Sequence, residues 1–149
     1  MITIDTNVLV YIHDSNDPAR QAASAEIFRK LVQIDAAIGL QAVGELHNVL
    51  RRKLRRPAWE AAQVARNMLV AFQKTFGPTE TAVQDALSSA SVGRLSYWDA
   101  LLVASARDAG CSTILSEDMR PGQLLSVEIV KPFDTSGVLT ARARELLEL

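Results

Sequence analysis

The chain has 149 residues, 48% of them hydrophobic and 22% charged, so it is long enough for one compact domain and is not a disordered segment. Its net charge of -1 lacks the basic excess typical of nucleic-acid binders, and no run approaches the roughly 20 apolar residues of a membrane helix. No basic segment followed by a long apolar run opens the chain, so no signal peptide is predicted and we expect a cytoplasmic protein without a membrane partner.

Short apolar segments alternate with helical patterns in the first half of the chain. Residues 2–5 are predicted to form a buried strand. Asp17 and Pro18 mark a helix start, because Asp caps a helix and Pro suits its first position. The further elements are a helix from there to about Val32, a strand over 36–40, a helix over 41–55, and a helix that begins at Pro57 and is followed by a break at Gly77 and Pro78.

Two capping patterns organise the second half. Thr81 and Gln84 have the spacing of a capping box, which predicts a helix that ends near Gly93. Ser96 is expected to open the next helix, with Gly110 as its stop. The remaining predicted elements are strands over 112–115 and 126–130 and a final helix over 135–149.

The alternation of strands and helices predicts an α/β fold, rich in helix, with a mostly parallel central sheet. No repeat, low-complexity tract or linker divides the chain, so residues 1–149 are expected to form a single domain. In such folds ligands bind at the carboxyl ends of the strands. Asp5 ends the first strand, and residues 116–118 follow the strand over 112–115, so both acidic segments are predicted at this edge.

Each acidic residue also has an ordinary structural interpretation. Asp99 stands three residues after Ser96, where an acid favours the first turn of a helix, although a first-turn side chain can still point into a cleft. Glu45 lies off the apolar stripe of its helix, as a solvated surface residue does. Glu117 and Asp118 lie in a segment whose polar residues also suit a solvated loop. Both interpretations stay open at this stage.

Several converging carboxylates would repel one another and raise their pKa values, and a divalent cation would relieve that repulsion. The chain has one cysteine, Cys111, and two histidines, which excludes an internal disulfide and disfavours a zinc site of histidine and cysteine. An oxygen-only site suits Mg²⁺ or Mn²⁺. Such a metal polarises a phosphoryl group and helps to generate hydroxide, which fits phosphodiester hydrolysis.

The densest basic segment is RRKLRR, over residues 51–56. Its arginines are candidate contacts for the phosphates of a nucleic-acid substrate. A solvated last turn of a helix, where cations suit the helix dipole, explains the same residues equally well. The arginines concerned are Arg51, Arg52, Arg55 and Arg56.

Four motifs occur in order along the chain: IDTNVLVY, AVGEL, SYWDALLVASARDAGC and ILSEDM. Their order and spacing resemble those of PIN-domain ribonucleases, most closely the VapC-like toxins of bacterial toxin–antitoxin pairs. The resemblance covers essentially the whole chain. It implies a three-layer α/β/α sandwich, a homodimer, and inhibition by a cognate antitoxin protein.

The resemblance also implies a site. In the PIN-domain family four acidic residues gather at one end of the sheet, bind Mg²⁺ or Mn²⁺ and hydrolyse RNA. The residues of this chain that match these four positions are Asp5, Glu45, Asp99 and Asp118. Thr6 and Asn7 match polar positions that support the first acid, and Ser116 belongs to the pattern around the fourth. Glu117 is an additional acid beside Asp118, so the assignment of the fourth position stays open.

We hypothesise that Asp5 and Asp99 are metal ligands, that Asp118 is a ligand directly or through water, and that Glu45 orients the attacking water or holds a second metal. Thr6 and Ser116 would hold the carboxylates by hydrogen bonds. A metal-dependent hydrolysis of this kind would leave 5′-phosphate and 3′-hydroxyl ends.

Three other functions share features with a toxin nuclease. A phospho-acceptor domain also uses a strand-end Asp and Mg²⁺, but the chain reads Asp5-Thr6-Asn7 in place of D-x-D and has no lysine between Lys74 and Lys131. A housekeeping RNA-processing nuclease would have the same site. A non-catalytic module that binds RNA or a partner protein is the third.

Overall fold

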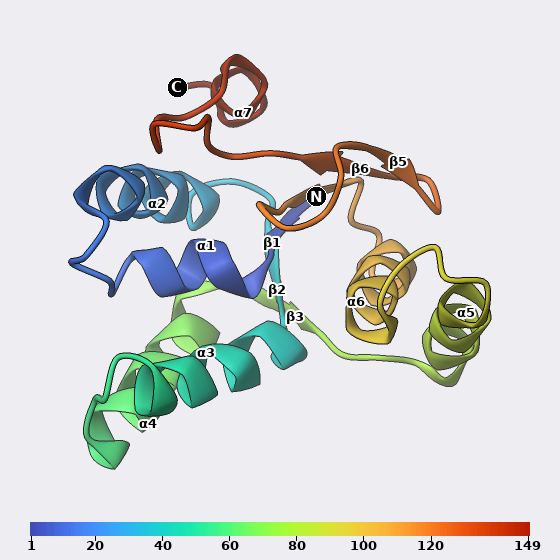
Figure 1. Ribbon diagram of the computed structural model, residues 1–149, viewed down its shortest axis with the longest axis horizontal. Coiled ribbons are helices and arrows are strands. Elements are labelled where there is room, and N and C mark those ends of the chain that lie inside the picture. Colours follow the sequence, from blue (N-terminus) through green and yellow to red (C-terminus); the bar gives the residue numbers. More distant parts are fainter.

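Three layers of secondary structure make up the computed structural model, which describes residues 1–149 (Figure 1). Helices α1 to α4 and α7 lie on one face of a central sheet; α6 covers the other face, and α5 packs on the outer side of α6. The helices are α1 (Thr6–Tyr11), α2 (Pro18–Leu31), α3 (Leu40–Arg52), α4 (Ala58–Ala71), α5 (Glu80–Ser91), α6 (Tyr97–Asp108) and α7 (Ala141–Leu147). The predicted helix-rich α/β/α sandwich is therefore confirmed. None of these helices has the length and apolar character needed to span a membrane.

The sheet is parallel except at one edge. The strands are β1 (Ile2–Ile4), β2 (Ala37–Gly39), β3 (Lys74–Phe76), β4 (Thr113–Leu115), β5 (Gly122–Leu124) and β6 (Val127–Val130). One group is ordered β1-β4-β6-β5, with only β5 antiparallel, and β2 pairs in parallel with β3. A parallel bridge between Ile2 and Ala36 joins β1 to β2.

Side-chain alternation along the strands builds a separate core on each face of the sheet. The register aligns Ile4, Leu115 and Val130 in one row, and all three pack toward α1 to α4. The neighbouring row contains Ile114 and Ile129, which pack against α6 on the opposite face. Because successive side chains of a strand point to opposite faces, three- and four-residue strands suffice to supply both cores.

The carboxyl ends of the strands lie close together at one edge of the sheet. The backbone N–H of Asp5 donates to the carbonyl of Leu115 at 2.9 Å, and the N–H of Ser116 donates to the carbonyl of Val130 at 3.1 Å. The ladder thus continues one residue beyond β1 and β4. Asp5 and Ser116 are consequently held side by side, as the parallel fold predicts.

Most predicted helix starts are confirmed. The carboxylate of Asp17 accepts from the N–H of Arg20 at 3.0 Å at the start of α2, and Ser96 caps α6 by accepting from the N–H of Asp99 at 3.2 Å. The cap predicted at Thr81 is wrong. Thr79 caps α5 instead, accepting from the N–H of Ala82 at 3.0 Å, because a cap needs no Glu or Gln at the third position to form.

Other differences concern short elements. Helix α1 and strands β3 and β5 were not predicted, because each is too short to show a periodic pattern. The final helix is shorter than predicted, since 135–137 form a turn and Leu139 pairs with Phe133 in an antiparallel bridge. The Asp134 carboxylate closes this turn by accepting from the N–H groups of Ser136 and Val138. Cys111 is buried in the core beside α6, and burial raises the pKa of its thiol to about 11.

Candidate active site

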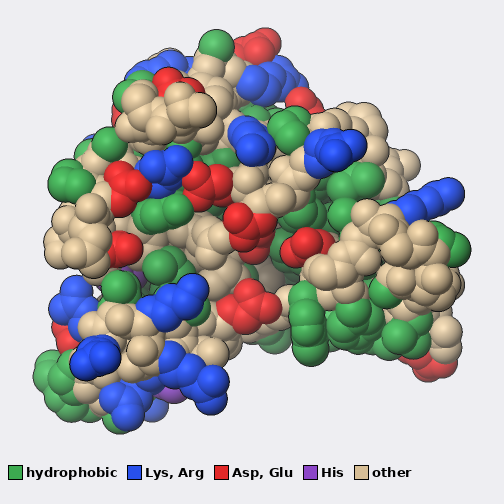
Figure 2. Space-filling view, in the orientation of Figure 1, with side chains coloured by type: hydrophobic (Ala, Val, Ile, Leu, Met, Phe, Trp, Pro, Cys, Tyr) green, Lys and Arg blue, Asp and Glu red, His purple; other side chains and the backbone are tan.

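One cavity of about 280 Å³ lies at the carboxyl edge of the sheet, between α1, α3 and the start of α6. The structure brings together here all four acids predicted from the sequence: Asp5, Glu45, Asp99 and Asp118. Acidic side chains surround the hollow in the middle of the face shown in Figure 2. Residues from four separate parts of the chain thus meet at the edge where an α/β sheet binds its ligands.

Asp5 is the most firmly held of the four acids. It is the N-cap of α1, and its Oδ1 accepts from the N–H of Thr6 at 2.7 Å. Its Oδ2 accepts from the hydroxyl of Ser116 at 2.8 Å. Ser116 is fully buried, and its Oγ also accepts from the N–H of Met119 at 3.2 Å. One serine therefore fixes both the Asp5 carboxylate and the loop that carries Asp118.

The electrostatics of Asp5 favour a cation nearby. Burial raises the pKa of its carboxyl above the usual value, and the negative charges of Asp118 and Asp99 raise it further. The hydrogen bonds from Ser116 and Thr6 act in the opposite direction and stabilise the ionised form. A positive charge among these acids would relieve their repulsion.

Glu45 lies on the exposed face of α3 but is not a free surface residue. Its Oε2 accepts from the hydroxyl of Thr6 at 2.6 Å, and its Oε1 accepts from the side-chain amide of Gln41 at 2.8 Å. The sequence pattern correctly placed it off the apolar stripe of α3. The buried Thr6 links it to the first turn of α1, directly beside Asp5.

Asp99 and Asp118 complete the lining. Asp99 is in the first turn of α6, where its N–H is capped by Ser96, and its side chain also lines the cavity. Both interpretations of Asp99 drawn from the sequence therefore hold together. Asp118 accepts a hydrogen bond from the side-chain amide of Asn7.

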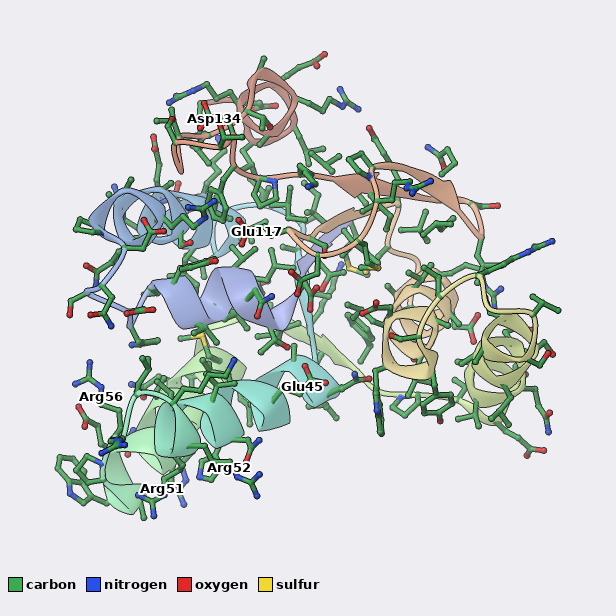
Figure 3. The ribbon with its side chains drawn as sticks, viewed as in Figure 1. Glu45, Arg51, Arg52, Arg56, Glu117 and Asp134 are labelled. Atoms are coloured by element: carbon green, nitrogen blue, oxygen red, sulfur yellow. The ribbon has the colours of Figure 1, made fainter.

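Glu117 does not line this cavity and lies beside α1 and α2 (Figure 3). Its Oε2 accepts from the hydroxyl of Tyr11 at 2.7 Å, and its Oε1 accepts from Nε of Arg20 at 2.8 Å. Arg20 also pairs with Asp17 at 2.9 Å. Burial and the hydrogen bond to Glu117 raise the pKa of Tyr11 to about 12. Of the two neighbouring acids, only Asp118 lines the cavity.

The basic segment lies at the end of α3 opposite Glu45, where Figure 3 labels Arg51, Arg52 and Arg56. Two of them make local contacts: Arg51 donates to the carbonyl of Arg56 at 2.8 Å, and Arg56 donates to the carbonyl of His13 at 3.2 Å. Arg52 and Arg55 are exposed. Arg52 lies seven residues after Glu45, two turns along the same helix face.

The donors around the cavity are carboxylate, amide and hydroxyl oxygens, the set that Mg²⁺ and Mn²⁺ prefer. No three His, Cys, Asp or Glu side chains lie close enough together to coordinate one ion. The chemistry and the charge of these donors fit a hard cation. Their carboxylates lie around the cavity and do not meet at one point.

Five residues of the cavity wall were not predicted from the sequence: Gln41, Asn48, Val49, Trp98 and Leu102. Gln41 and Asn48 lie four residues before and three residues after Glu45, so the helical repeat places them on the face of α3 that carries Glu45. Trp98, next to Asp99, lines the same cavity and is 61% exposed. The exposure of Trp98 depends on tertiary packing, and the order of residues around Asp99 does not indicate it.

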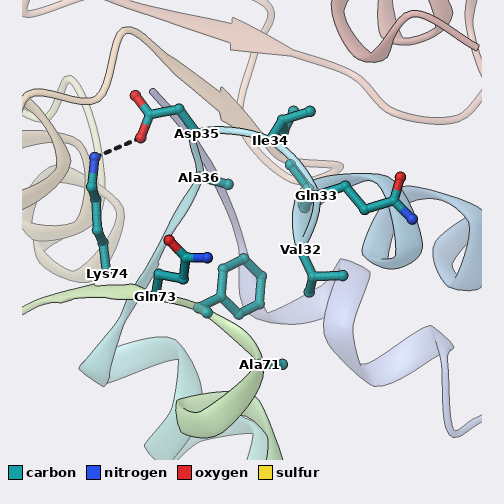
Figure 4. Close-up of a pocket in the computed structure, with 10 residues that line it drawn as sticks. Val32, Gln33, Ile34, Asp35, Ala36, Ala71, Gln73 and Lys74 are labelled. Atoms are coloured by element: carbon teal, nitrogen blue, oxygen red, sulfur yellow. Dashed lines mark hydrogen bonds and ion pairs between the residues drawn. The ribbon is translucent and has the colours of Figure 1, made fainter.

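A different hollow, of about 300 Å³, lies where α2 leads into β2 and α4 leads into β3 (Figure 4). Nζ of Lys74 donates to the carboxylate of Asp35 at 2.6 Å across it. It lies at the amino ends of β2 and β3, and none of the four predicted acids lines it. It is therefore separate from the candidate active site.

Comparisons with known proteins agree with this architecture. Two solved structures are similar in fold. VapC20 of Mycobacterium tuberculosis, described as a sarcin-ricin loop cleaving toxin, has a TM-score of 0.63 and 17% identity, with 79% of this chain and 92% of that chain covered. FitAB bound to an IR36 DNA fragment has a TM-score of 0.56 and 16% identity, with 79% and 85% covered. A search of curated proteins found no match. The family model described as PIN domain matches residues 2–124, and the chain therefore belongs to the PIN domain family.

Proposed function

We propose that the protein is a metal-dependent endoribonuclease that hydrolyses RNA phosphodiester bonds and acts as the toxin of a toxin–antitoxin pair. The observation that carries the proposal is the meeting of Asp5, Glu45, Asp99 and Asp118 around one cavity at the carboxyl edge of the sheet, in a PIN-domain chain. The similarity to VapC20, described as a sarcin-ricin loop cleaving toxin, supports the proposed activity and biological role.

Asp5, Asp99 and Asp118 are the residues proposed to hold Mg²⁺ or Mn²⁺, in part through water molecules on the cation, because the three carboxylates do not meet at one point. When bound, such a cation polarises the scissile phosphoryl group and lowers the pKa of a water molecule. Glu45 is positioned by Thr6 and Gln41 to accept a hydrogen bond from the attacking water and to orient it. The exposed Arg52 and Arg55 are proposed to contact substrate phosphates.

Three residues are proposed to hold the acids in place. Ser116 and Thr6 fix the two oxygens of Asp5 by hydrogen bonds, and Asn7 donates to Asp118. The bond from Thr6 lies within the start of α1, and the bonds of Ser116 and Asn7 join the start of α1 to the loop after β4. Such supporting hydrogen bonds set the orientation of a carboxylate before it engages a ligand.

A cognate antitoxin and a second copy of the chain are the proposed protein partners, in a cytoplasmic complex. The family membership and the likeness to VapC20 support both. Copurification of the chain with the product of a small neighbouring gene, and its mass in solution, test these two points separately from the chemistry.

The test of the activity is RNA cleavage by the purified chain with Mg²⁺ or Mn²⁺ and with EDTA, beside Asp5→Asn and Asp99→Asn. Glu80→Gln, an exposed acid in the first turn of α5, is the matched control. The proposal predicts cleavage that requires metal, is lost in both Asp variants, and leaves 5′-phosphate and 3′-hydroxyl ends. A 2′,3′-cyclic phosphate end, or cleavage that survives EDTA and both substitutions, contradicts it.

A further inference from the structure

A second cavity, of about 360 Å³, opens beside the one that holds the acids. It is lined by Gln41, Gly44, Glu45, Asn48 and Trp98, and all of these except Gly44 also line the acidic cavity. The two cavities therefore share a wall. We call this second cavity the Trp98 slot; it lies between one face of α3 and the start of α6.

Trp98 is the aromatic wall of the slot. It is 61% exposed, although it stands next to Asp99 in the first turn of α6. Its ring packs edge to face with Tyr97, with the ring centroids 5.0 Å apart. A large apolar side chain is thus held at the surface, beside the acids, with much of its area free for contact.

Gly44 stands in the opposite wall, in the middle of α3. Glycine is less favourable than alanine inside a helix, so its presence there usually has a reason. Packing within the chain supplies none, because a Cβ at Gly44 would meet no atom within 4 Å. The missing side chain leaves α3 open at the point where it faces the slot.

The polarity of the slot indicates what would enter it. Glu45 is its only charged lining residue, and the amides of Gln41 and Asn48 offer hydrogen-bond donors and acceptors. No lysine or arginine lines it, so a phosphate group would find no counter-charge. A neutral, flat ring with polar edges fits these walls: it can stack on Trp98 and form hydrogen bonds with the amides.

We propose that the Trp98 slot binds one unstacked nucleobase of single-stranded RNA, next to the phosphate presented to the four acids. Trp98 is the stacking platform, Gly44 provides the clearance, and Gln41 and Asn48 contact the base edge. This proposal rests on the proposed ribonuclease function and adds a requirement for an unpaired base at the cleavage site. Arg52, one turn beyond Asn48 on α3, is placed to meet the neighbouring phosphate.

Tryptophan fluorescence tests the slot directly, because the chain has two tryptophans and Trp59 lies on α4, away from the slot, 74% exposed. In a Trp59→Phe, Asp5→Asn chain with Mg²⁺, emission comes from Trp98 alone and the RNA stays uncleaved. We expect single-stranded RNA to quench this emission, and a duplex or inorganic polyphosphate to leave it unchanged. Trp98→Ala is expected to weaken the binding of single-stranded RNA about 10-fold or more, and Trp98→Tyr to retain most of it.

Gly44→Leu tests the clearance without disturbing the fold, since leucine favours helix and space is open at Gly44. We expect it to reduce RNA binding as Trp98→Ala does, with no loss of thermal stability, while Trp59→Ala leaves binding unchanged. Quenching that is absent, or binding that neither variant alters, overturns the slot. If the wild-type chain still cleaves RNA in that case, the proposed ribonuclease function stands; if it does not, both proposals fall.

Discussion

The hydroxyl of Ser116 donates a 2.8 Å hydrogen bond to the carboxylate of Asp5, a residue 111 positions away in the chain. The bond joins the ends of two neighbouring parallel strands, β1 and β4. It exists because each strand ends at the same edge of the sheet and because Ser116 is buried beneath the cavity. Together with the 2.9 Å hydrogen bond from the N–H of Asp5 to the carbonyl of Leu115, it ties Asp5 to the end of β4.

Removing the hydroxyl of Ser116 tests the role of this bond. Ser116→Ala is expected to lower the free energy of unfolding by about 1–3 kcal/mol, because a buried acceptor and the N–H of Met119 lose their partner. Cleavage should fall about 10-fold to 100-fold, as for other residues that orient a ligand. Chemical denaturation and cleavage rates measure the two effects. Ser112→Ala, which removes only a 3.3 Å bond at an exposed hydroxyl, is the control and should change neither.

The pH dependence of stability follows from the raised pKa of Asp5. A carboxyl whose pKa is higher in the folded state destabilises the fold when it is ionised, and this penalty is absent below the pKa of the unfolded chain. Asp5→Asn, measured in EDTA, should therefore melt at a higher temperature than the wild type at neutral pH. The difference should shrink as the pH falls through the folded-state pKa of Asp5 toward its ordinary value. A variant that is less stable at neutral pH contradicts this assignment.

The two neighbouring acids of the β4 loop are predicted to behave in opposite ways. Glu117→Ala removes the acceptor of Tyr11 and Arg20, and should cost about 1–3 kcal/mol of stability while leaving cleavage by the folded protein largely intact. Asp118→Asn should abolish or strongly reduce cleavage with little effect on the melting temperature. Equal loss of activity in both variants, at a temperature where both are folded, would show that the loop acts as a single unit.

The arginines of the basic segment are also predicted to fall into two classes, those that bind RNA and those that stabilise the fold. Arg52→Ala and Arg55→Ala should each weaken RNA binding a few-fold and reduce the salt dependence of binding by roughly the share of one phosphate contact. Arg56→Ala should instead lower the free energy of unfolding, since Arg56 donates to the carbonyl of His13 and forms an ion pair with Glu60, with 3.6 Å between Nη1 and Oε1. Binding titrations at several salt concentrations separate the two classes. Equal salt slopes for all three variants and the wild type would rule out phosphate contacts here.

The sequence predicted the parts of the structure that repeat or that have a local chemical cause. Asp17 and Ser96 cap helices because their side chains bond to an N–H only three residues away. The apolar residues before Asp5 and before Ser116 predict the two strands, and therefore predict that both side chains lie at strand ends. Thr79, by contrast, caps α5 without the reciprocal partner that makes a cap recognisable, and three-residue strands such as β3 have no period to detect.

The contacts of the candidate site are harder to predict from local sequence patterns. Periodicity placed Glu45 on the exposed face of α3, which is correct, but its hydrogen bond to Thr6 spans 39 positions and depends on how α1 packs against α3. Only the resemblance to a known family singled out Glu45 in advance. The orientation of Glu117 toward Arg20 and the exposure of Trp98 also depend on tertiary packing, which a single sequence does not display.

The central claim is that the acids around one cavity form a single metal site, and Mn²⁺ binding measured by titration calorimetry tests it most directly. The wild type, Asp5→Asn, Asp99→Asn and Glu117→Gln would be titrated under identical conditions after treatment with EDTA and dialysis. The account predicts that the wild type and Glu117→Gln bind Mn²⁺ alike, and that Asp5→Asn and Asp99→Asn each bind at least about 10-fold more weakly. Equal binding by all four proteins, or no binding by the folded wild type, would contradict it.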